Sequence, residues 1–304
     1  MLSYDTIKQH PEKFLSCTSV TPDEFTDLLV AFTAAWNVYA RRTYVNSGGG
    51  KPKLPRVEDK LFFILYYYKV YPIQTVMGAV FDISQSQVSH WVGVLSPILR
   101  QSFDYTRCLP ETRPQNVKDA LEACDMHDFI IDGTERERQR PGDPDEQKAY
   151  YSGKNKAYTS NNILIVDANA QTVVYLSPTY EGTWHDKAIC DAEAYIFPEN
   201  ATLQKDRGFQ GYEPQNTITY QPKKKPRDKE LPLIDKFINS VLSNSRIAIE
   251  HVICGVKRLH IVKDIYRNRR DGFDDLIMEI ACAMHNFRHK HRSKQETIDM
   301  FAMT

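Results

Sequence analysis

The sequence predicts an α/β protein in which a mixed sheet flanked by helices follows an all-helical region. Two changes of pattern along the 304 residues support this prediction. Up to about residue 105 the apolar residues recur at helical spacing, whereas from about residue 128 short apolar runs alternate with turn residues, as in strands. Helical spacing returns after residue 233. Strands followed by helices in this way are typical of a mixed α/β domain.

Composition narrows the class of protein. Hydrophobic residues make up 41% of the chain and charged residues 26%, which suits a water-exposed protein with a large core. The chain has no apolar run of about 18 residues and begins without an apolar signal segment, so we expect no membrane span. We expect the cytoplasm or nucleoid in a bacterium, or the nucleus in a eukaryote. Six cysteines without a C-x-x-C pair favour reduced thiols over a disulfide framework or a Cys-rich zinc site.

Charge is distributed unevenly although the net charge is zero. Residues 221–304 contain 17 Lys and Arg against 11 Asp and Glu, so the rest of the chain is acidic by the same margin. A basic C-terminal third beside an acidic middle fits a protein that binds polyanions and also concentrates carboxylates for cations. Ordinary solvated surface charge would produce the same asymmetry.

The N-terminal residues 1–45 are expected to be helical. Residues 21–42 have the spacing of one amphipathic helix, with Thr21 as N-cap, Pro22 in the first turn and Glu24 completing a capping box. Residues 46–56 contain three glycines and two prolines without periodicity, which predicts a linker.

Residues 57–105 are expected to form a helix-turn-helix DNA-binding domain. We predict one helix over 57–71, then a helix over 75–81, a turn over 82–84 and a second helix over 85–95. Short polar side chains at the start of a recognition helix reach base edges. The candidates here are Gln85, Ser86, Gln87, Ser89 and His90, and Trp91 is a candidate stacking residue. The apolar set expected to close the small core is Val76, Ala79, Val80, Ile83, Val88 and Val92. An ordinary helical hairpin explains the pattern equally well.

Residues 106–127 are expected to connect this region to an α/β domain over 128–292, with a tail over 293–304. We predict a strand over 128–134 that ends in an acid, and a β-hairpin with its turn at 167–171. A helix capped by Thr183 and a strand over 201–206 follow. Long helices are predicted over 233–260 and 273–289.

Three carboxylates stand at the ends or on the faces of these predicted elements. Asp132 ends the first strand, Asp206 ends a later strand, and Glu250 lies on a helical strip of apolar residues that we expect to face the core. Acids at the ends of adjacent strands converge, and a helix packed on the sheet can present a third. Such carboxylates bind hard cations, which can support phosphodiester cleavage. Singly, each acid has an ordinary explanation: a turn residue, a partner of Arg207, or a helical pair with Arg246.

The chain resembles a DDE transposase of the IS5/Harbinger type. The segments that carry the resemblance run from about residue 20 to 290. They are "TPDEFTDLLVAF", "GGGKPKL", "FDISQSQVSHWV", "IIDGTE", "YYSGKNKAYT", "GTWHDKAI", "KDRGFQGY", "SRIAIEHVICGVKR" and "AMHNFRH". The resemblance implies an RNase H-like catalytic fold with Asp132, Asp206 and Glu250 as the catalytic, metal-binding triad. A related bacterial signature, Tyr-x2-Arg-x3-Glu-x6-Lys, falls on 243–257, with Ser243 in place of the Tyr.

The same resemblance implies cofactors and partners. We expect two Mg²⁺ or Mn²⁺ ions, cleavage at transposon terminal inverted repeats, and joining of the freed 3′-hydroxyls to target DNA. We expect Arg246, Lys257 and Arg258 to contact DNA phosphates. His185 is a possible residue at the edge of the site, and the neighbouring Asp186 is interpreted as a helix N-terminal residue favoured by the helix dipole. A homodimer or higher assembly on DNA is expected.

Two other functions remain compatible with the sequence. One is a domesticated relative of transposases that binds DNA without cutting it, and the other is a metal-dependent host nuclease. Within the basic tract "YRNRR", Arg267, Arg269 and Arg270 are further candidates for phosphate contacts.

Overall fold

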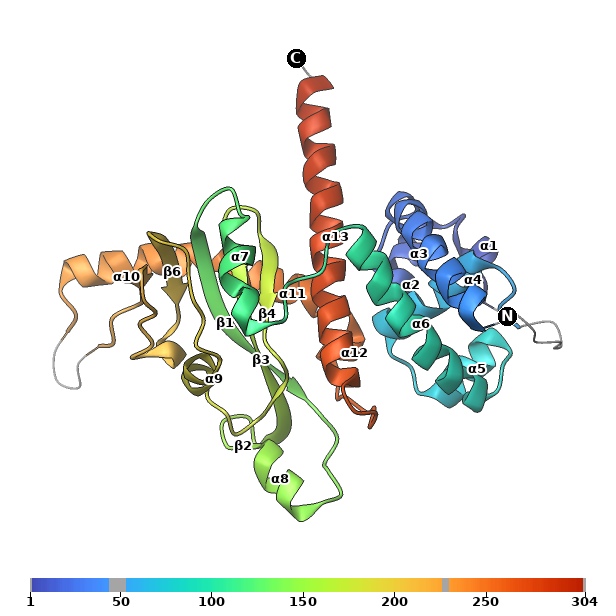
Figure 1. Ribbon diagram of the computed structural model, residues 1–304, viewed down its shortest axis with the longest axis horizontal. Helices are drawn as coiled ribbons and strands as arrows, with labels where there is room; N and C mark the ends of the chain where they lie inside the picture. The colour runs from blue at the N-terminus through green and yellow to red at the C-terminus, as the bar shows by residue number, and fades with distance from the viewer. Residues whose placement is uncertain (1, 44–52, 226–229, 303–304) are drawn as a thin grey trace. The chain divides into compact units, whose positions relative to one another are not determined.

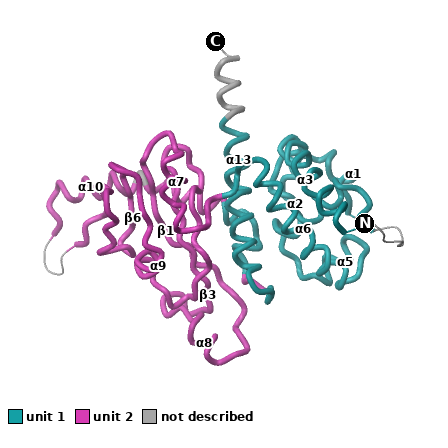
Figure 2. The backbone as a smooth tube through the Cα atoms, in the orientation of Figure 1, with its two compact units in different colours: residues 1–109, 256–264, 268–304 teal, residues 110–255, 265–267 magenta. Residues whose placement is uncertain are grey.

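The computed structural model describes residues 2–43, 53–225 and 230–302, with side chains omitted at 244–245 and 294–302. Most of the predicted linker over 46–56 therefore lies outside the described residues. The chain forms two compact units, shown in Figure 2. A helical unit comprises residues 1–109, 256–264 and 268–304, and an α/β unit comprises residues 110–255 and 265–267. The predicted domain boundaries stay a prediction, because a compact unit is defined by contacts and not by independent folding. In the described part of the chain, no helix is long and apolar enough to cross a membrane.

The helical unit combines the N-terminal helices with the C-terminal ones. Its helices are α1 (Tyr4–Ile7), α2 (Pro11–Thr18), α3 (Pro22–Thr43), α4 (Val57–Val70), α5 (Gln74–Phe81), α6 (Gln85–Tyr105), α12 (His260–Lys263) and α13 (Phe273–Ala302). The predicted capping box of α3 is confirmed: the Thr21 N–H donates to Glu24 Oε2 at 2.8 Å, and the Glu24 N–H donates to Thr21 Oγ1 at 3.2 Å. The helix α13 packs against α6, where the rings of Phe103 and Phe287 lie 5.9 Å apart.

The helices α5 and α6 and the turn between them have the layout expected of a helix-turn-helix. Asp82 ends α5 in the left-handed conformation, and Ser84 caps α6 in a capping box with Gln87. The turn passes so close to α5 that a Cβ on Gly78 would lie 2.6 Å from the carbonyl oxygen of Ile83. Only glycine therefore fits at position 78.

The predicted core of this motif is confirmed on α6, where Val88 and Val92 are fully buried, and was wrong on α5 by about one residue in phase. Val76 is 49% exposed, and the buried residues of α5 are Met77, Gly78 and Phe81. The reason is non-local: the ring of Phe81 packs edge-on to that of Phe63 on α4, with centroids 5.0 Å apart. Aromatic packing on α4 rotates α5 away from the face that its own aliphatic residues indicate.

The α/β unit is built around one mixed sheet (Figure 1). Its strands are β1 (Asp128–Glu137), β2 (Tyr151–Ser152), β3 (Ala157–Asp167), β4 (Thr172–Leu176), β5 (Tyr180–Glu181), β6 (Ala201–Lys205) and β7 (Thr217–Tyr220). The main path runs β2-β3-β1-β6-β7, and β4 and β5 also pair with β3. The strand β3 is antiparallel to β1 and β4, whereas β1, β6 and β7 are parallel. This confirms the predicted fold class, a mixed sheet flanked by helices after a helical region.

Short helices connect and cover the strands. They are η1 (Pro114–Asn116), α7 (Val117–Glu122), α8 (Pro144–Tyr150), α9 (Asp186–Glu193), η2 (Arg207–Phe209), α10 (Leu233–Ser245) and α11 (Ile247–Val256). One face of the sheet forms a core with α7 and α9, in which Phe129 and Ile131 of β1 contact Leu121 and Ile189. In Figure 1, α7 lies in front of the sheet, whereas α10 and α11 pass behind it.

Two of the predicted helices differ from the structure, and β7 has no predicted counterpart. The single helix expected over 233–260 is divided into α10, α11 and α12, with a turn at Arg246. The helix expected from Thr183 begins at Asp186, and the N-cap position is His185. The strand β7 was not predicted, because its four residues are too few for a periodic signal.

Candidate active site and recognition helix

The parallel register of β1 and β6 brings two of the predicted acids together. The last paired residues are Ile131 and Lys205, so Asp132 and Asp206 occupy the next position on each strand. The expectation that Asp132 ends its strand was wrong, since β1 continues to Glu137 beside β3. It is β6 that ends here. The pairing of β1 with β6 stops at Ile131 and Lys205, so Asp132 has no paired residue on the β6 side.

Each of these aspartates is fixed by a glycine that follows it. The Gly133 N–H donates to Asp132 Oδ1 at 2.9 Å, and the Gly208 N–H donates to Asp206 Oδ1 at 2.6 Å. The Asp206 side chain thereby caps η2. Just before it, the buried Lys205 anchors the loop by donating to Glu213 Oε1 at 2.6 Å. Both carboxylates are thus held in defined orientations by backbone N–H groups that follow them, in strand β1 for Asp132 and in η2 for Asp206.

The electrostatics of the pair favour a cation. Burial, with the nearby Asp206 charge as the second cause, raises the pKa of the Asp132 carboxyl from 3.8 to about 6, and the Arg246 guanidinium lowers it in part. The distance from Arg246 Nη2 to Asp132 Oδ2 is 3.8 Å. Two neighbouring carboxylates repel each other when both are ionised, and a divalent cation removes that repulsion.

The third predicted acid is placed differently from what we expected. Glu250 lies on the exposed face of α11, whereas Ile249, Val252 and Val256 are buried. Successive residues of a helix are about 100° apart, so a carboxylate next to a buried isoleucine can still face solvent. The expectation that Glu250 faces the core was therefore wrong. No described hydrogen bond or ion pair joins Glu250 to Asp132 or Asp206.

A different acid, Asp186, lies beside the aspartate pair. A Cβ placed on Gly133 would lie 2.2 Å from Asp186 Oδ1, and one on Gly208 would lie 3.1 Å from Asp186 Oδ2. The Asp186 charge also contributes to the raised pKa of Asp132. Sequence reasoning interpreted Asp186 as a helix N-terminal residue only. The available signal was a glycine following both aspartates, which leaves room for a third side chain. His185 beside it is exposed and makes no capping hydrogen bond through its side chain.

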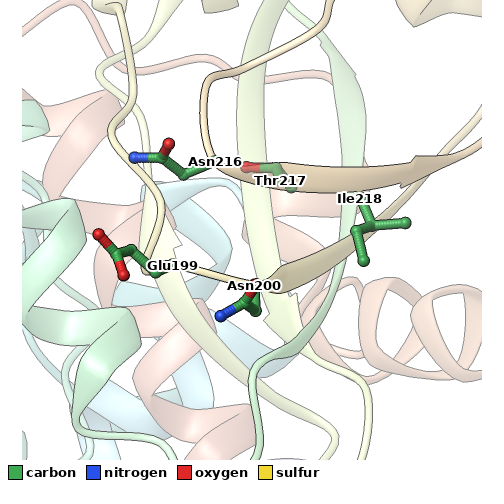
Figure 3. Close-up of a pocket in the computed structure, with 5 residues that line it drawn as sticks. All are labelled: Glu199, Asn200, Asn216, Thr217 and Ile218. Carbon is green, nitrogen blue, oxygen red and sulfur yellow. The ribbon is translucent and has the colours of Figure 1, made fainter.

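The donor chemistry of this group fits a hard divalent cation, since carboxylate oxygens are the ligands that Mg²⁺ and Mn²⁺ prefer. A complete ligand set is not preassembled: among the described residues, no three His, Cys, Asp or Glu side chains are arranged to hold a metal ion. A surface pocket of about 490 Å³ lies elsewhere on the unit (Figure 3). Glu199, Asn200 and Asn216 line it at the amino ends of β6 and β7, whereas Asp206 follows the carboxyl end of β6. The aspartate pair is therefore the candidate active site.

Comparison with known families agrees with both parts of the chain. Residues 131–286 match the DDE superfamily endonuclease family, and residues 52–104 match the helix-turn-helix of DDE superfamily endonuclease. The chain belongs to the DDE superfamily endonucleases. The second match favours the helix-turn-helix over an ordinary helical hairpin.

Individual proteins are also similar to this DDE superfamily endonuclease. The probable transposase for insertion sequence element IS702 from Microchaete diplosiphon is 28% identical over 226 residues, which are 74% of this chain and 78% of the relative. Among solved structures, the cryo-EM structure of a piggyBac transposase synaptic complex with hairpin DNA matches with a TM-score of 0.37 and 9% identity. That match covers 91% of this chain and 68% of the other.

Several of the predicted base-reading residues of α6 are exposed to solvent, although some of their side chains already form hydrogen bonds within the protein. Gln85 Nε2 donates to Gln74 Oε1 at 2.6 Å, and the Ser86 and Ser84 hydroxyls lie 2.9 Å apart. Gln87 Oε1 accepts from the Ser84 N–H at 3.0 Å within the capping box. Exposed residues of α6 include Gln85, Ser86, Gln87 and His90.

The other two residues singled out on α6 are engaged with the protein. Arg270 Nη2 donates to both the Ser89 carbonyl oxygen and Ser89 Oγ at 2.9 Å, so the Arg270 guanidinium lies on the recognition helix. Trp91 is only 8% exposed, and its ring centroid is 6.2 Å from that of Trp36. The suggestion that Trp91 stacks on bases was therefore wrong, because the indole is part of the core.

Two cations that follow Glu250, Lys257 and Arg258, lie after the end of the helix in which we expected them. The helix α11 ends at Val256, so Lys257 and Arg258 occupy the turn between α11 and α12. Arg258 is exposed, and its carbonyl oxygen accepts from Lys69 Nζ at 2.9 Å. Burial lowers the pKa of the Lys69 ammonium, with the Arg258 charge as the second cause. The helical unit thus concentrates positive charge at this turn.

Proposed function

We propose that this DDE superfamily endonuclease is a transposase that binds transposon terminal inverted repeats, cleaves there with divalent metal, and joins the 3′-hydroxyls to target DNA. The observation that carries the proposal is the register of β1 and β6, which aligns Asp132 with Asp206 inside the matched family region. The helix-turn-helix match supports the DNA-binding half of the proposal. Acting on chromosomal DNA, the protein would work in the nucleoid of a bacterium or the nucleus of a eukaryote.

In this proposal Asp132, Asp206 and Glu250 bind Mg²⁺ or Mn²⁺, with two ions expected. The metal supplies charge neutralisation at the scissile phosphate and lowers the pKa of bound water. Asp132 would provide a ligand from strand β1 and Asp206 from the N-cap of η2, and the hydrogen bonds to both carboxylates keep the binding geometry reproducible. Glu250 contributes from the exposed face of α11, where the carboxylate is accessible to metal and DNA. Arg246, 3.8 Å from Asp132, offsets part of the negative charge while no metal is bound.

DNA binding is proposed to involve both units. The exposed side chains of Gln85, Ser86, Gln87 and His90 would contact base edges, and Ser89 would act by holding Arg270 beside them. Lys257, Arg258 and Arg246 would contact phosphates, which carry affinity and salt dependence and no sequence information. His185 stays a possible contact at the edge of the site.

A homodimer or higher assembly on DNA is part of the proposal, since two transposon ends must be joined. The support in this chain is α10, which exposes several large apolar side chains to solvent. Its exposed residues are Leu233, Ile234, Phe237, Ile238 and Val241, with exposures from 41% to 84%. Light scattering of the complex with end DNA, compared with the free protein, measures this directly.

The test is a cleavage assay on DNA that carries the inverted repeats flanking the gene. The wild-type protein with Mg²⁺ or Mn²⁺ is expected to nick at the repeat ends, and EDTA is expected to abolish nicking. Asp132→Asn, Asp206→Asn and Glu250→Gln are each expected to lower the rate by at least about 10³-fold, since each removes a metal ligand. Asp125→Asn, an exposed acid in the same unit, is the control.

The outcomes separate the candidate functions. Sequence-specific binding without metal-dependent nicking would support a domesticated DNA-binding protein. Nicking without preference for the repeats would support a host nuclease. If Glu250→Gln cleaves like the wild type while both aspartate variants fail, the proposed triad is wrong in its third member.

A further inference from the structure

The two glycines beside the aspartate pair create a gap that one side chain fills. Gly133 follows Asp132 directly, and Gly208 lies two residues after Asp206. Neither glycine has a positive φ, so backbone conformation does not require glycine at either position. At Gly133 the Asp186 carboxylate excludes a larger residue, because Asp186 Oδ1 lies 2.2 Å from the missing Cβ position. At Gly208 the missing Cβ position lies 2.9 Å from Asp206 Oδ1 and 3.1 Å from Asp186 Oδ2, so both carboxylates border it.

The Asp186 side chain is oriented by a buried amide. Asn161 Nδ2 donates to Asp186 Oδ1 at 2.8 Å, and Asn161, in the central strand β3, is only 2% exposed. Its other amide atom, Oδ1, is buried and has no hydrogen-bond partner in the described residues. A buried amide oxygen without a partner is costly, and amide oxygens are among the ligands that hard cations accept.

Asp186 brings a further negative charge to the aspartate pair. Like charges of Asp132 and Asp206 stand nearby, and the described ion pairs include none to Asp186. On the same helix, Asp191 is by contrast paired with Lys187. The helix α9 is only eight residues long, and Asp186 is its first residue.

We propose that Asp186 is a metal-binding carboxylate of the active site, oriented by Asn161, which enters through the gap left by Gly133 and Gly208. This inference rests on the proposed function, because it adds a ligand to the same metal site. It changes the composition of that site: Asp132 and Asp206 are joined by an acid from α9, in addition to Glu250 from α11.

The experiment measures Mn²⁺ binding by the full-length protein without DNA, by electron paramagnetic resonance of free Mn²⁺ and by calorimetry. Asp186→Asn retains the shape of the side chain and is expected to weaken Mn²⁺ binding roughly tenfold to a hundredfold. Asn161→Ala is expected to weaken it several-fold, because the carboxylate loses its orientation. Asp191→Asn, on the same helix, is the matched control and is expected to bind like the wild type.

A second readout locates the metal. Fe²⁺ with ascorbate cleaves a chain near its bound iron, and fragments are expected from breaks near Gly133, Asp186 and Gly208. The breaks near Asp186 should disappear in Asp186→Asn, whose thermal unfolding shows whether the fold is intact. If Asp186→Asn is unstable, Asn161→Ala and Gly133→Ala replace it, since the atoms nearest to an added Cβ at Gly133 all belong to the Asp186 carboxylate.

The results distinguish this inference from the proposed function. Loss of Mn²⁺ binding in Asp132→Asn with unchanged binding in Asp186→Asn would overturn the role of Asp186 alone. Unchanged binding in both variants would overturn the metal site itself, and with it the proposed function. Weaker binding in both, with Asp191→Asn unaffected, is the expected result.

Discussion

At the residue scale, Asp132 couples the stability of the metal-free protein to pH. Its pKa is raised from 3.8 to about 6 by burial and by the Asp206 charge. The folded protein therefore binds a proton between these pH values that the unfolded chain has released. The free energy of unfolding consequently falls as pH rises from about 4 to about 6 and stays lower above that, by at most about 3 kcal/mol.

Asp132→Asn removes this penalty. In EDTA at pH 7.5 the variant is expected to resist urea better than the wild type, and near pH 4 the two should be alike. Added Mn²⁺ should reverse the order at pH 7.5 by stabilising only the wild type. Urea titrations at both pH values measure the difference, with Asp125→Asn as control. A less stable Asp132→Asn protein in EDTA at pH 7.5 would contradict the raised pKa.

The residues of the site could be predicted from the sequence only in part. Asp132 and Asp206 stood out because each follows an apolar run, which is a local signal. Their pairing depends on a parallel register between segments about 70 residues apart, which no local pattern encodes. The interpretation of Asp186 as a helix N-terminal residue is confirmed, whereas its proximity to the pair was missed for the same reason: Gly133 and Gly208 are remote from it in sequence. Glu250 was assigned to the buried face because a helix rich in apolar residues does not reveal which face is covered.

At the element scale, the close turn of the helix-turn-helix makes a sharp prediction about Gly78. A methyl group there would lie 2.6 Å from the Ile83 carbonyl oxygen, which is backbone and cannot rotate away. Gly78→Ala is expected to cost about 1–3 kcal/mol of stability and to weaken binding of repeat DNA. Urea denaturation and fluorescence anisotropy measure the two effects. Gly142→Ala, where a Cβ meets nothing within 4 Å, is the control, and equal behaviour of both variants would refute the strained turn.

The anchoring of Arg270 to the recognition helix predicts a distinct effect on DNA affinity. Arg270→Ala removes a cation held at Ser89, so binding should weaken for repeat and random DNA alike. The slope of log affinity against log salt should decrease by about 1, whereas Lys118→Ala, which removes an α7 charge of the α/β unit paired with Glu122, should leave it unchanged. A titration of anisotropy over several salt concentrations checks both. An unchanged slope in Arg270→Ala would show that this arginine only supports the helix.

The presence of a helix was easier to predict than its buried face or the residue at which it is interrupted. The capping box of α3 is confirmed because Thr21 and Glu24 are three residues apart and need no other element. The rotation of α5 was missed because Phe63, on another helix, determines it. The break at Arg246 was missed because neither proline nor glycine marks it.

At the scale of the whole molecule, the helical unit is assembled from both ends of the chain. The C-terminal helix α13 contributes Ile277, Ile280 and Met284 to its core, and each is fully buried. Arg292 pairs with Glu24 at 2.9 Å, and Asn286 donates to the Cys108 carbonyl oxygen at 3.1 Å. The N-terminal helices therefore lack part of their core without α13.

A fragment of residues 1–109 is accordingly expected not to fold cooperatively. Its thermal melt by circular dichroism should be broad, and protease should degrade it rapidly, because the surface that α13 covers is apolar. Joining residues 256–304 to the fragment through a flexible linker should restore a cooperative melt. A sharp melt of the fragment alone would show that α13 is dispensable for this unit.

The interruption of the helical unit by the α/β unit also affects how the protein is made. A ribosome releases α1 to α6 long before it has synthesised α13, which completes their core. At roughly 5–20 residues per second, the early helices wait on the order of 10–40 s for that partner. A polypeptide cut short during translation would lack α13 and leave the apolar surface of these helices exposed to water.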